Sequence, residues 1–207
     1  MPQEEVYMNR VITISREFGS GGREIGKRLS DELGIAYYDN EIVKQIAKKT
    51  KLAEAYVQQI VEKSPMVFFP ITIGQTFYVG NDPNMEMSNA VYAEQEKLLH
   101  ELAEKSSCVI VGRCADYILR DYSPFRLFVY ADMEFKLARC REKAPEGEHL
   151  TDKELTKQIK SVDSERAKYY QFITGNNWGD ILNYDLCVNT GKAPISTIVS
   201  GIAKFIK

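Results

Sequence analysis

The stretch Val11–Leu33, VITISREFGSGGREIGKRLSDEL, decides how this chain folds. It opens with a β-branched apolar run, VITI, which is typical of a central parallel strand. Ile25, Leu29 and Leu33 then recur every four residues, as on one face of a helix. The turn between them, GSGG, lacks side chains that would keep an anion from the backbone, and the helix start offers free N–H groups. The stretch therefore predicts a strand, an anion-binding turn and a helix.

This turn departs from the phosphate-binding pattern G-x-x-x-x-G-K-[ST], whose Lys reaches the phosphates and whose hydroxyl helps to hold magnesium. With Gly21 as the second glycine, Arg16 replaces the first glycine, Gly22 the Lys and Arg23 the Ser or Thr. A second register, GGREIGKR, is rejected because its Lys27 would lie about a full turn into the helix. The alternative interpretation is a glycine-rich turn that binds nothing.

Length, charge balance, cysteine spacing and the lack of long apolar segments limit the classes of protein to which this chain can belong. The 207 residues are enough for one α/β domain, and 27 basic against 29 acidic residues argue against a nucleic-acid surface. The four cysteines form no C-x-x-C pair, so we expect no structural zinc. The N-terminal MPQEEVYMNR has no apolar signal core, and no window approaches ~20 apolar residues, so we expect a cytoplasmic protein without a membrane partner. The sequence leaves the oligomeric state open.

Further strands are predicted at 35–38, 108–111, 126–131 and 186–188, with amphipathic helices between them and a last helix over 195–206. Asp39 directly follows the second strand. It is either the N-cap of the next helix or a contact for an acceptor substrate, because ligands bind at the carboxyl ends of parallel strands.

Arg113 follows the apolar strand CVIV through Gly112, so its guanidinium is expected at the same sheet edge as the glycine-rich turn. There it would suit a phosphate or carboxylate. The alternative is a surface arginine paired with Asp116 or Asp121.

Two segments are candidates for moving parts. Met66–Met87 is rich in aromatics, Pro, Gly and Met, and is either a cover over an acceptor pocket or a packing loop, before a helix that we expect from Ser88 to about Lys105. A capping box at Thr151 opens a long helix on which Asp163 and Arg166 are three residues apart. Beside a triphosphate, its cations would neutralise developing charge.

Four motifs together resemble the bacterial cytidylate kinase-like family of nucleoside monophosphate kinases: ISREFGSGGREIGKRL, YYDNEIV, VIVGRCADYIL and DSERAKYYQFITGNNWGDILNYDLCVNTG. The resemblance implies a P-loop α/β sandwich of three layers, with five parallel strands in the order 2-3-1-4-5 between helices. It also implies ATP and Mg²⁺ as cofactors, an acceptor-binding insertion at about 39–87 and a lid at about 143–180, within a single domain over 1–207.

The same resemblance suggests roles for individual residues. The donor phosphates would be held by the turn, namely Gly19, Ser20, Gly21, Gly22 and Arg23. Arg113 falls on the arginine of a G-R-D motif that contacts the acceptor, and Asp39 lies near the start of the acceptor region. Asp163 and Arg166 match an aspartate and an arginine of the lid, and Asp163, like Asp39 and Arg113, is expected to bind the substrate. Arg23 and Arg166 are the expected catalytic residues.

The sequence departs from the family pattern at two places. The P-loop Lys is absent, so Arg23, or alternatively Arg16, must supply its charge. Cys114 replaces the aspartate of G-R-D, and a thiol does not accept from a base amino group as a carboxylate does. The leading hypothesis is transfer of the γ-phosphoryl group of ATP to a nucleoside monophosphate or another small phosphorylated acceptor. The alternatives are a nucleotide-binding or sensing protein that has lost transfer, and a site for an inorganic anion.

Overall fold

The computed structural model describes residues 9–62, 83–145, 147 and 150–206. Its centre is a parallel sheet of five strands in the order β2-β3-β1-β4-β5, as predicted. The strands are β1 (Val11–Arg16), β2 (Ala36–Tyr38), β3 (Cys108–Val111), β4 (Phe125–Tyr130) and β5 (Leu186–Asn189). Every residue of β1 and of β3 is buried, and β3 is an unbroken apolar run, whereas β1 also buries Thr13, Ser15 and Arg16.

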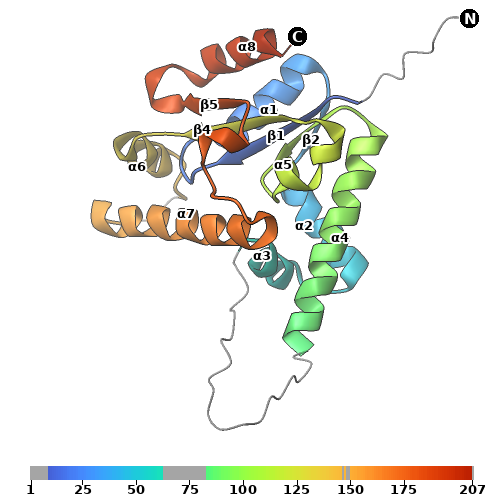
Figure 1. Ribbon diagram of the computed structural model, residues 1–207. Coiled ribbons are helices and arrows are strands. Elements are labelled where there is room, and N and C mark those ends of the chain that lie inside the picture. The colour runs from blue at the N-terminus through green and yellow to red at the C-terminus, as the bar shows by residue number, and fades with distance from the viewer. Residues whose placement is uncertain (1–8, 63–82, 146, 148–149, 207) are drawn as a thin grey trace, which may run out of the picture.

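Helices cover both faces of the sheet (Figure 1). On one face, α1 (Gly22–Leu33) and α8 (Ile195–Phe205) pack over β1, β3 and β4 through a core that includes Ile25, Leu29 and Ile202. The other face carries α2 (Asn40–Thr50), α3 (Glu54–Glu62), α4 (Pro83–Lys105) and the short α5 (Ala115–Ile118). The resulting sandwich has three layers. In the described part of the chain, no helix has both the length and the apolar character that a membrane crossing requires.

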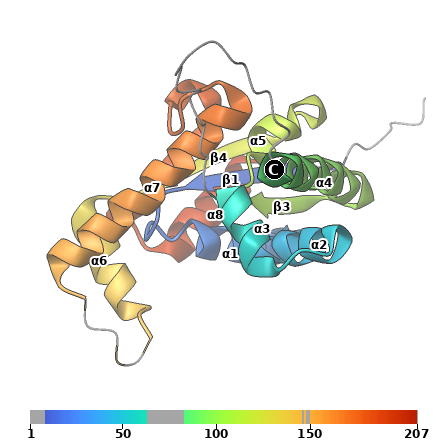
Figure 2. The same cartoon turned by 90° about the horizontal axis from the view of Figure 1, so that it is seen from below.

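Two remaining helices lie at one edge of the sheet. These are α6 (Met133–Glu142) and α7 (Asp152–Thr174), and Figure 2 shows α7 crossing beneath the edge where β1 and β4 end. The capping box at Thr151 is present, with the Thr151 side chain accepting from the Glu154 N–H and the Glu154 carboxylate accepting from the Thr151 N–H. Three single turns, η1 (Arg120–Tyr122), η2 (Ile181–Asn183) and η3 (Thr190–Lys192), complete the elements.

The strand register brings the predicted site residues together at the carboxyl ends of β1 and β3. Ile14 of β1 lies beside Val111 of β3, so the ends of both strands leave the sheet together. Arg16 and the turn at Gly112 are therefore neighbours, although almost 100 residues separate them in the chain.

One helix boundary was wrong. α4 begins at Pro83 and not at Ser88, because proline fits the first position of a helix, where no N–H partner is needed. The segment predicted as a cover or packing loop, Met66–Met87, lies outside the described residues up to position 82.

Candidate functional site

The predicted anion-binding turn, residues 19–22, lies where β1 connects to α1; the whole connection, residues 17–21, is called the glycine-rich turn. Gly21 occupies the N-cap position with φ 85°, a conformation that favours glycine, and no side chain caps the helix. The first N–H groups of α1 thus keep the capacity to bind an anion. Ser20, by contrast, is fully buried, and its hydroxyl donates to the Glu17 carbonyl at 2.8 Å. Thr190 also donates to the Ser20 carbonyl at 2.7 Å, which ties the turn to the end of β5.

The glycines of the turn are required by packing within the protein. A Cβ at Gly19 would lie 2.9 Å from Cys140 Sγ of α6, and a Cβ at Gly21 would lie 2.9 Å from Ile195 Cδ1 of α8. At Gly22, the position of the P-loop Lys, a Cβ would lie 2.5 Å from the Cβ of Arg16. Tertiary contacts of the empty protein therefore account for the absence of side chains here.

Arg16 occupies the space beside Gly22. Its side chain passes Gly22 and ends at Gly112, where a Cβ would overlap Arg16 Nη1. The residue is 9% exposed, and among the described residues its Nε has no hydrogen-bond partner. Burial, reinforced by the positive charges of Arg166 and Arg113, lowers the pKa of Arg16 to about 9. A buried guanidinium among other arginines is an environment in which a bound anion would be strongly favoured.

Arg113 points into the same region from the turn after β3. It is 5% exposed, so the alternative of a surface arginine is wrong, and its Nη1 donates to the Val61 carbonyl at 3.3 Å. Gly112, Arg113 and Cys114 have φ values of 76°, 62° and 51°, and such a left-handed run is strained for the two residues that are not glycine. The surrounding structure must therefore stabilise this conformation, which places Arg113 at the sheet edge.

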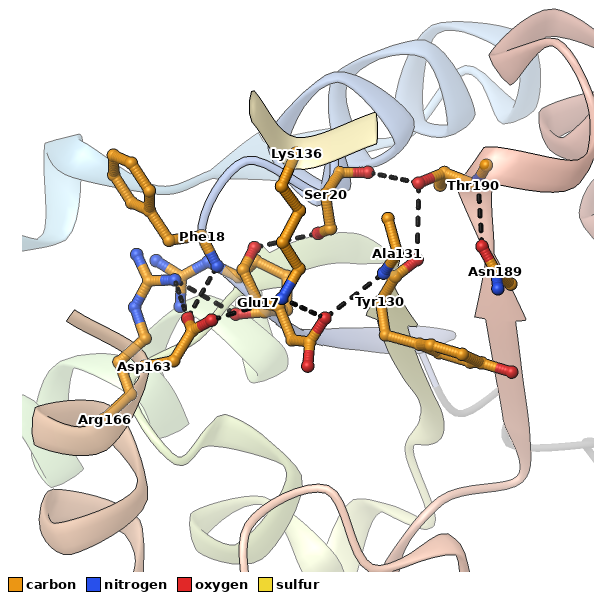
Figure 3. A network of polar contacts seen from close by, with 12 residues as sticks. Glu17, Phe18, Ser20, Tyr130, Ala131, Lys136, Asp163, Arg166, Asn189 and Thr190 are labelled. Atoms are coloured by element: carbon orange, nitrogen blue, oxygen red, sulfur yellow. Dashed lines mark hydrogen bonds and ion pairs between the residues drawn. The ribbon is translucent and has the colours of Figure 1, made fainter. Parts of the chain in front are cut away.

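Arg166 and Asp163 reach the edge from α7 (Figure 3). Arg166 Nη1 donates to the Arg16 carbonyl at 3.1 Å, and its guanidinium lies 5.8 Å from the centre of the Phe18 ring. Asp163 Oδ1 accepts from the Phe18 N–H at 2.6 Å and lies 3.6 Å from Arg166 Nη1. The two residues are in contact, as their i,i+3 spacing predicted.

Arg23 and Asp39 form an ion pair with 2.8 Å between Nε and Oδ2. The Arg23 side chain is half exposed, and its Nη2 also donates to Asn40 at 3.1 Å. Asp39 stands at the N-cap position of α2, as one of its two interpretations predicted, but its side chain makes no capping hydrogen bond. Among the described residues, its buried Oδ1 has no hydrogen-bond partner, which leaves an acceptor atom for a ligand. The catalytic role of Arg23 and the substrate role of Asp39 stay predictions.

Lys136 and Glu17 were not identified from the sequence. Lys136 is 5% exposed on α6, and its Nζ lies 2.6 Å from Glu17 Oε2 and 3.4 Å from Asp163 Oδ2 (Figure 3). Glu17 also accepts from the Ala131 N–H at 3.2 Å. A lone Lys between Phe135 and Leu137 gives no sequence signal. Only its place, one turn after β4 in a parallel sheet, could have suggested that it faces the carboxyl edge.

Three cavities adjoin these residues. The arginines Arg16, Arg113 and Arg166 line a cavity of about 30 Å³ with Tyr169 and Trp178, which is room for water and not for a nucleotide. A cavity of about 600 Å³ lies between the turn, α6 and the start of α7, and a third of about 370 Å³ lies between α1, α6 and the start of α8. Arg139 lines both of the larger cavities, whose volumes are in the range of small-molecule sites.

The residues around the glycine-rich turn suit a magnesium ion that is bound together with the nucleotide phosphates. They suit a magnesium ion held by the protein alone less well. Among the described residues, no group of three His, Cys, Asp or Glu side chains could hold a metal. Burial opposes ionisation of Glu24 in the first turn of α1, but Arg139 at 2.5 Å and Arg28 at 2.8 Å hold its pKa below the ordinary value. Mg²⁺ is commonly bound through one or two carboxylates plus substrate phosphates, so a closed protein cage is not needed. The uncapped start of α1 and the buried Arg16 Nε suit the phosphates themselves.

A family model described as the cytidylate kinase-like family matches residues 11–192. A curated relative, the cytidylate kinase of Pyrococcus horikoshii, is 23% identical over 193 residues, which are 93% of this chain and 83% of that protein. Both comparisons agree with the resemblance carried by the four motifs.

Solved structures show the same fold. An uncharacterised protein from Eubacterium ventriosum has a TM-score of 0.69 and 28% identity, covering 95% of this chain and 98% of its own. Shikimate kinase from Bacteroides thetaiotaomicron has a TM-score of 0.55 and 14% identity, covering 95% and 98%. Shikimate kinase from Acinetobacter baumannii, solved with shikimate, has a TM-score of 0.52 and 14% identity, covering 97% and 93%.

Proposed function

The chain belongs to the cytidylate kinase-like family, and from this premise we propose that it transfers the γ-phosphoryl group of ATP to a nucleoside monophosphate. CMP is one candidate acceptor because of the family and of the cytidylate kinase relative. Cys114, buried in the turn after β3, gives no support to cytosine recognition, so another monophosphate or small phosphorylated molecule is an equal candidate.

One observation carries the proposal: Arg16, Arg113 and Arg166 line one cavity at the carboxyl edge of a parallel sheet, beside a glycine-rich turn. They come from β1, from the turn after β3 and from α7. Three guanidinium groups held so close repel one another, and this repulsion adds to the effect of burial in lowering the pKa of Arg16. A dianionic phosphate between them would relieve that repulsion and gain charge-assisted hydrogen bonds.

The chemistry expected of these residues is positioning and neutralisation of charge. Arg113 would orient the acceptor phosphate, and Arg16, between the turn and Arg113, would bind where charge accumulates during in-line transfer. Arg166 would close over the transferring group from α7. A phosphate acceptor needs no general base, because its oxygen is already ionised near neutral pH.

The donor would lie against the turn and α6. When bound, ATP supplies the phosphoryl group, and Mg²⁺ offsets the charge of its oxygens. The uncapped N–H groups of α1 would hold phosphate oxygens, and the 600 Å³ cavity beside Phe18 and Arg139 is the candidate for base and ribose. The 30 Å³ arginine cavity must widen for an acceptor, so we expect α7 to move during the cycle.

A nucleotide-binding or sensing protein without transfer is the second candidate. It is favoured by the absence of the P-loop Lys, whose position is occupied by Gly22, because that Lys carries much of the charge stabilisation in phosphoryl transfer. This candidate predicts ATP binding in calorimetry but no ADP above the hydrolysis background.

The test is a coupled assay of ADP formation with ATP, Mg²⁺ and each of CMP, UMP, AMP and GMP. We expect turnover with at least one acceptor, and a loss of about 100-fold or more in kcat/KM for Arg16→Met, because one group binding transition-state charge is removed. Arg120→Met is the matched control. Arg120 is exposed and donates to the Tyr117 carbonyl at 3.0 Å, so it should retain full activity.

The outcomes separate the two candidates. No ADP above background with any acceptor, together with ATP binding, would favour the sensing protein. Turnover that survives Arg16→Met unchanged would leave transfer intact but remove Arg16 from its mechanism.

A further inference from the structure

A side chain of the protein itself fills an anion position at the glycine-rich turn. The Phe18 N–H donates to Asp163 Oδ1 at 2.6 Å, and Lys136 Nζ lies 3.4 Å from Asp163 Oδ2. Arg166 Nη1 lies 3.6 Å from the same carboxylate (Figure 3). A backbone N–H before a glycine, an ammonium and a guanidinium are the donors that proteins present to phosphate oxygens.

The donors come from three separate parts of the chain. Phe18 belongs to the turn, Lys136 to α6 and Arg166 to α7, and Asp163 lies 145 positions from Phe18 in the sequence. Gly19 is held against α6, where an added Cβ would lie 3.2 Å from the Lys136 carbonyl, so the turn and the ammonium keep a fixed spacing. The position is therefore built by the fold and would persist without the Asp163 carboxylate.

The local charges would permit an exchange. Lys136 Nζ is 2.6 Å from Glu17, so the ammonium keeps a counter-charge if Asp163 departs. Burial raises the pKa of Asp163 in spite of the Phe18 N–H and the two nearby cations, which indicates a carboxylate that is costly to keep ionised there. Asp163 is on α7 and its competitor would come from solvent, so the exchange would free part of α7 from the turn.

We propose that Asp163 is an internal substitute for a phosphate oxygen, and that the Phe18 N–H, Lys136 and Arg166 form a site which an oxyanion of a polyphosphate enters by displacing it. The identity of that polyphosphate as a nucleotide donor rests on the proposed function, whereas the site itself does not. Asp163 then acts against ligand binding in the empty protein, which differs from the substrate contact expected for it from the sequence.

The test measures binding of inorganic tripolyphosphate to the full chain by calorimetry, without nucleotide or turnover. Asp163→Asn keeps the shape of the side chain and removes its charge, and should bind tripolyphosphate about tenfold more tightly than the unaltered protein, equivalent to ~1.4 kcal/mol. Adding Lys136→Met to that variant should abolish the gain. Asp185→Asn is the matched control, because it removes the same charge at the opposite edge of the sheet, where Asp185 pairs with Arg126, and should change affinity less than about twofold.

The proposal is overturned if the Asp163→Asn variant binds tripolyphosphate no more tightly than the Asp185→Asn variant does.

A second measurement uses the unaltered protein and does not depend on whether the variant folds. At saturating tripolyphosphate, the Phe18 amide should acquire a scalar coupling to phosphorus across its hydrogen bond, and an unchanged Phe18 amide resonance overturns the proposal. Absence of phosphoryl transfer in the coupled assay would refute the proposed function and leave both of these results unaffected.

Discussion

The glycine-rich turn and the turn after β3 stand at the same sheet edge but balance their charges differently. Around the first, two cations meet carboxylates: the buried Lys136 contacts Glu17 and Asp163, and the partly buried Arg139 contacts Glu24. Around the second, Arg16 and Arg113 face each other and Arg166, and the negative charge that acts on Arg16 is that of Asp39. Asp39 is itself paired with Arg23.

This difference shows where an anion would be bound most strongly. Near the glycine-rich turn a phosphate must replace carboxylates already in contact with cations, whereas beside Arg16 it meets a buried guanidinium whose Nε has no hydrogen-bond partner among the described residues. The glycine-rich turn, which is the most recognisable motif of the sequence, thus lies in the more neutral of the two regions. The excess positive charge lies on the side proposed for the acceptor.

Of the variants that compare these two turns, the one that removes Arg113 should lose the most phosphate affinity. Arg113→Met should weaken binding of inorganic phosphate by about 10- to 100-fold, because a buried charge-assisted hydrogen bond contributes ~1.5–3 kcal/mol. Arg23→Met is the comparison, since Arg23 is half exposed and already paired with Asp39, and it should weaken binding less than about threefold. The increase in melting temperature with phosphate concentration gives both affinities.

A larger loss in Arg23→Met than in Arg113→Met would reverse the comparison. It would place the main anion site at the glycine-rich turn and support the catalytic role that the sequence assigned to Arg23.

The fold could be predicted from local pattern because most of its strands and helices have a clear apolar period. β3 is an unbroken apolar run and β1 begins with the β-branched run VITI, and the order of the strands followed from the family resemblance. The start of α4 was missed because Pro83 looked like part of a loop, although proline is well accommodated at a first helical position. Local rules also placed the capping box at Thr151 correctly, since all its atoms lie within one turn.

The site was predictable where a residue follows a strand directly, or where the family resemblance marked it, as for Asp163 and Arg166 on α7. Arg113 and the glycine-rich turn were found in this way, and both reach the predicted edge. Lys136 and the contact between Phe18 and Asp163 were not, because they depend on how α6 and α7 fold back over the turn. Packing also decides between Arg16 and Arg23 for the space beside Gly22, and it favours Arg16.

The Gly22→Ala variant should show an intermediate effect, on the free energy of unfolding. It tests whether packing against Arg16 requires a glycine at position 22. The added Cβ would lie 2.5 Å from the Cβ of Arg16, an atom close to the backbone that cannot swing away, so unfolding free energy should fall by ~2 kcal/mol. Gly201→Ala is the matched control, because Gly201 lies in α8 with no atom within 4 Å of an added Cβ. It should stabilise the protein by ~0.5–1 kcal/mol through helix propensity. Urea unfolding measures both, and equal effects would show that Arg16 does not hold the space at Gly22.

The smallest effect is expected at the opposite edge of the sheet, where an arginine already has its carboxylate. Arg126 Nη2 lies 2.7 Å from Asp185 Oδ1, and both side chains are about one-third exposed, so Asp185→Asn should cost only ~0.5–1 kcal/mol at pH 7. The hydrogen bonds from Arg126 lower the pKa of Asp185 below its unfolded value of ~3.9. This contribution is complete above the unfolded pKa and is lost as pH falls through the folded pKa, so the difference from the unaltered protein should vanish toward pH 2. Urea unfolding at pH 7, 4 and 2 follows this loss, and a difference that persists at the lowest pH would mean that the pair contributes by shape and not by charge. Phosphate affinity should stay unchanged in this variant. Arg126 is paired with a carboxylate at a distance from the proposed site, whereas Arg16 is buried among other arginines, where a bound anion would be stabilising.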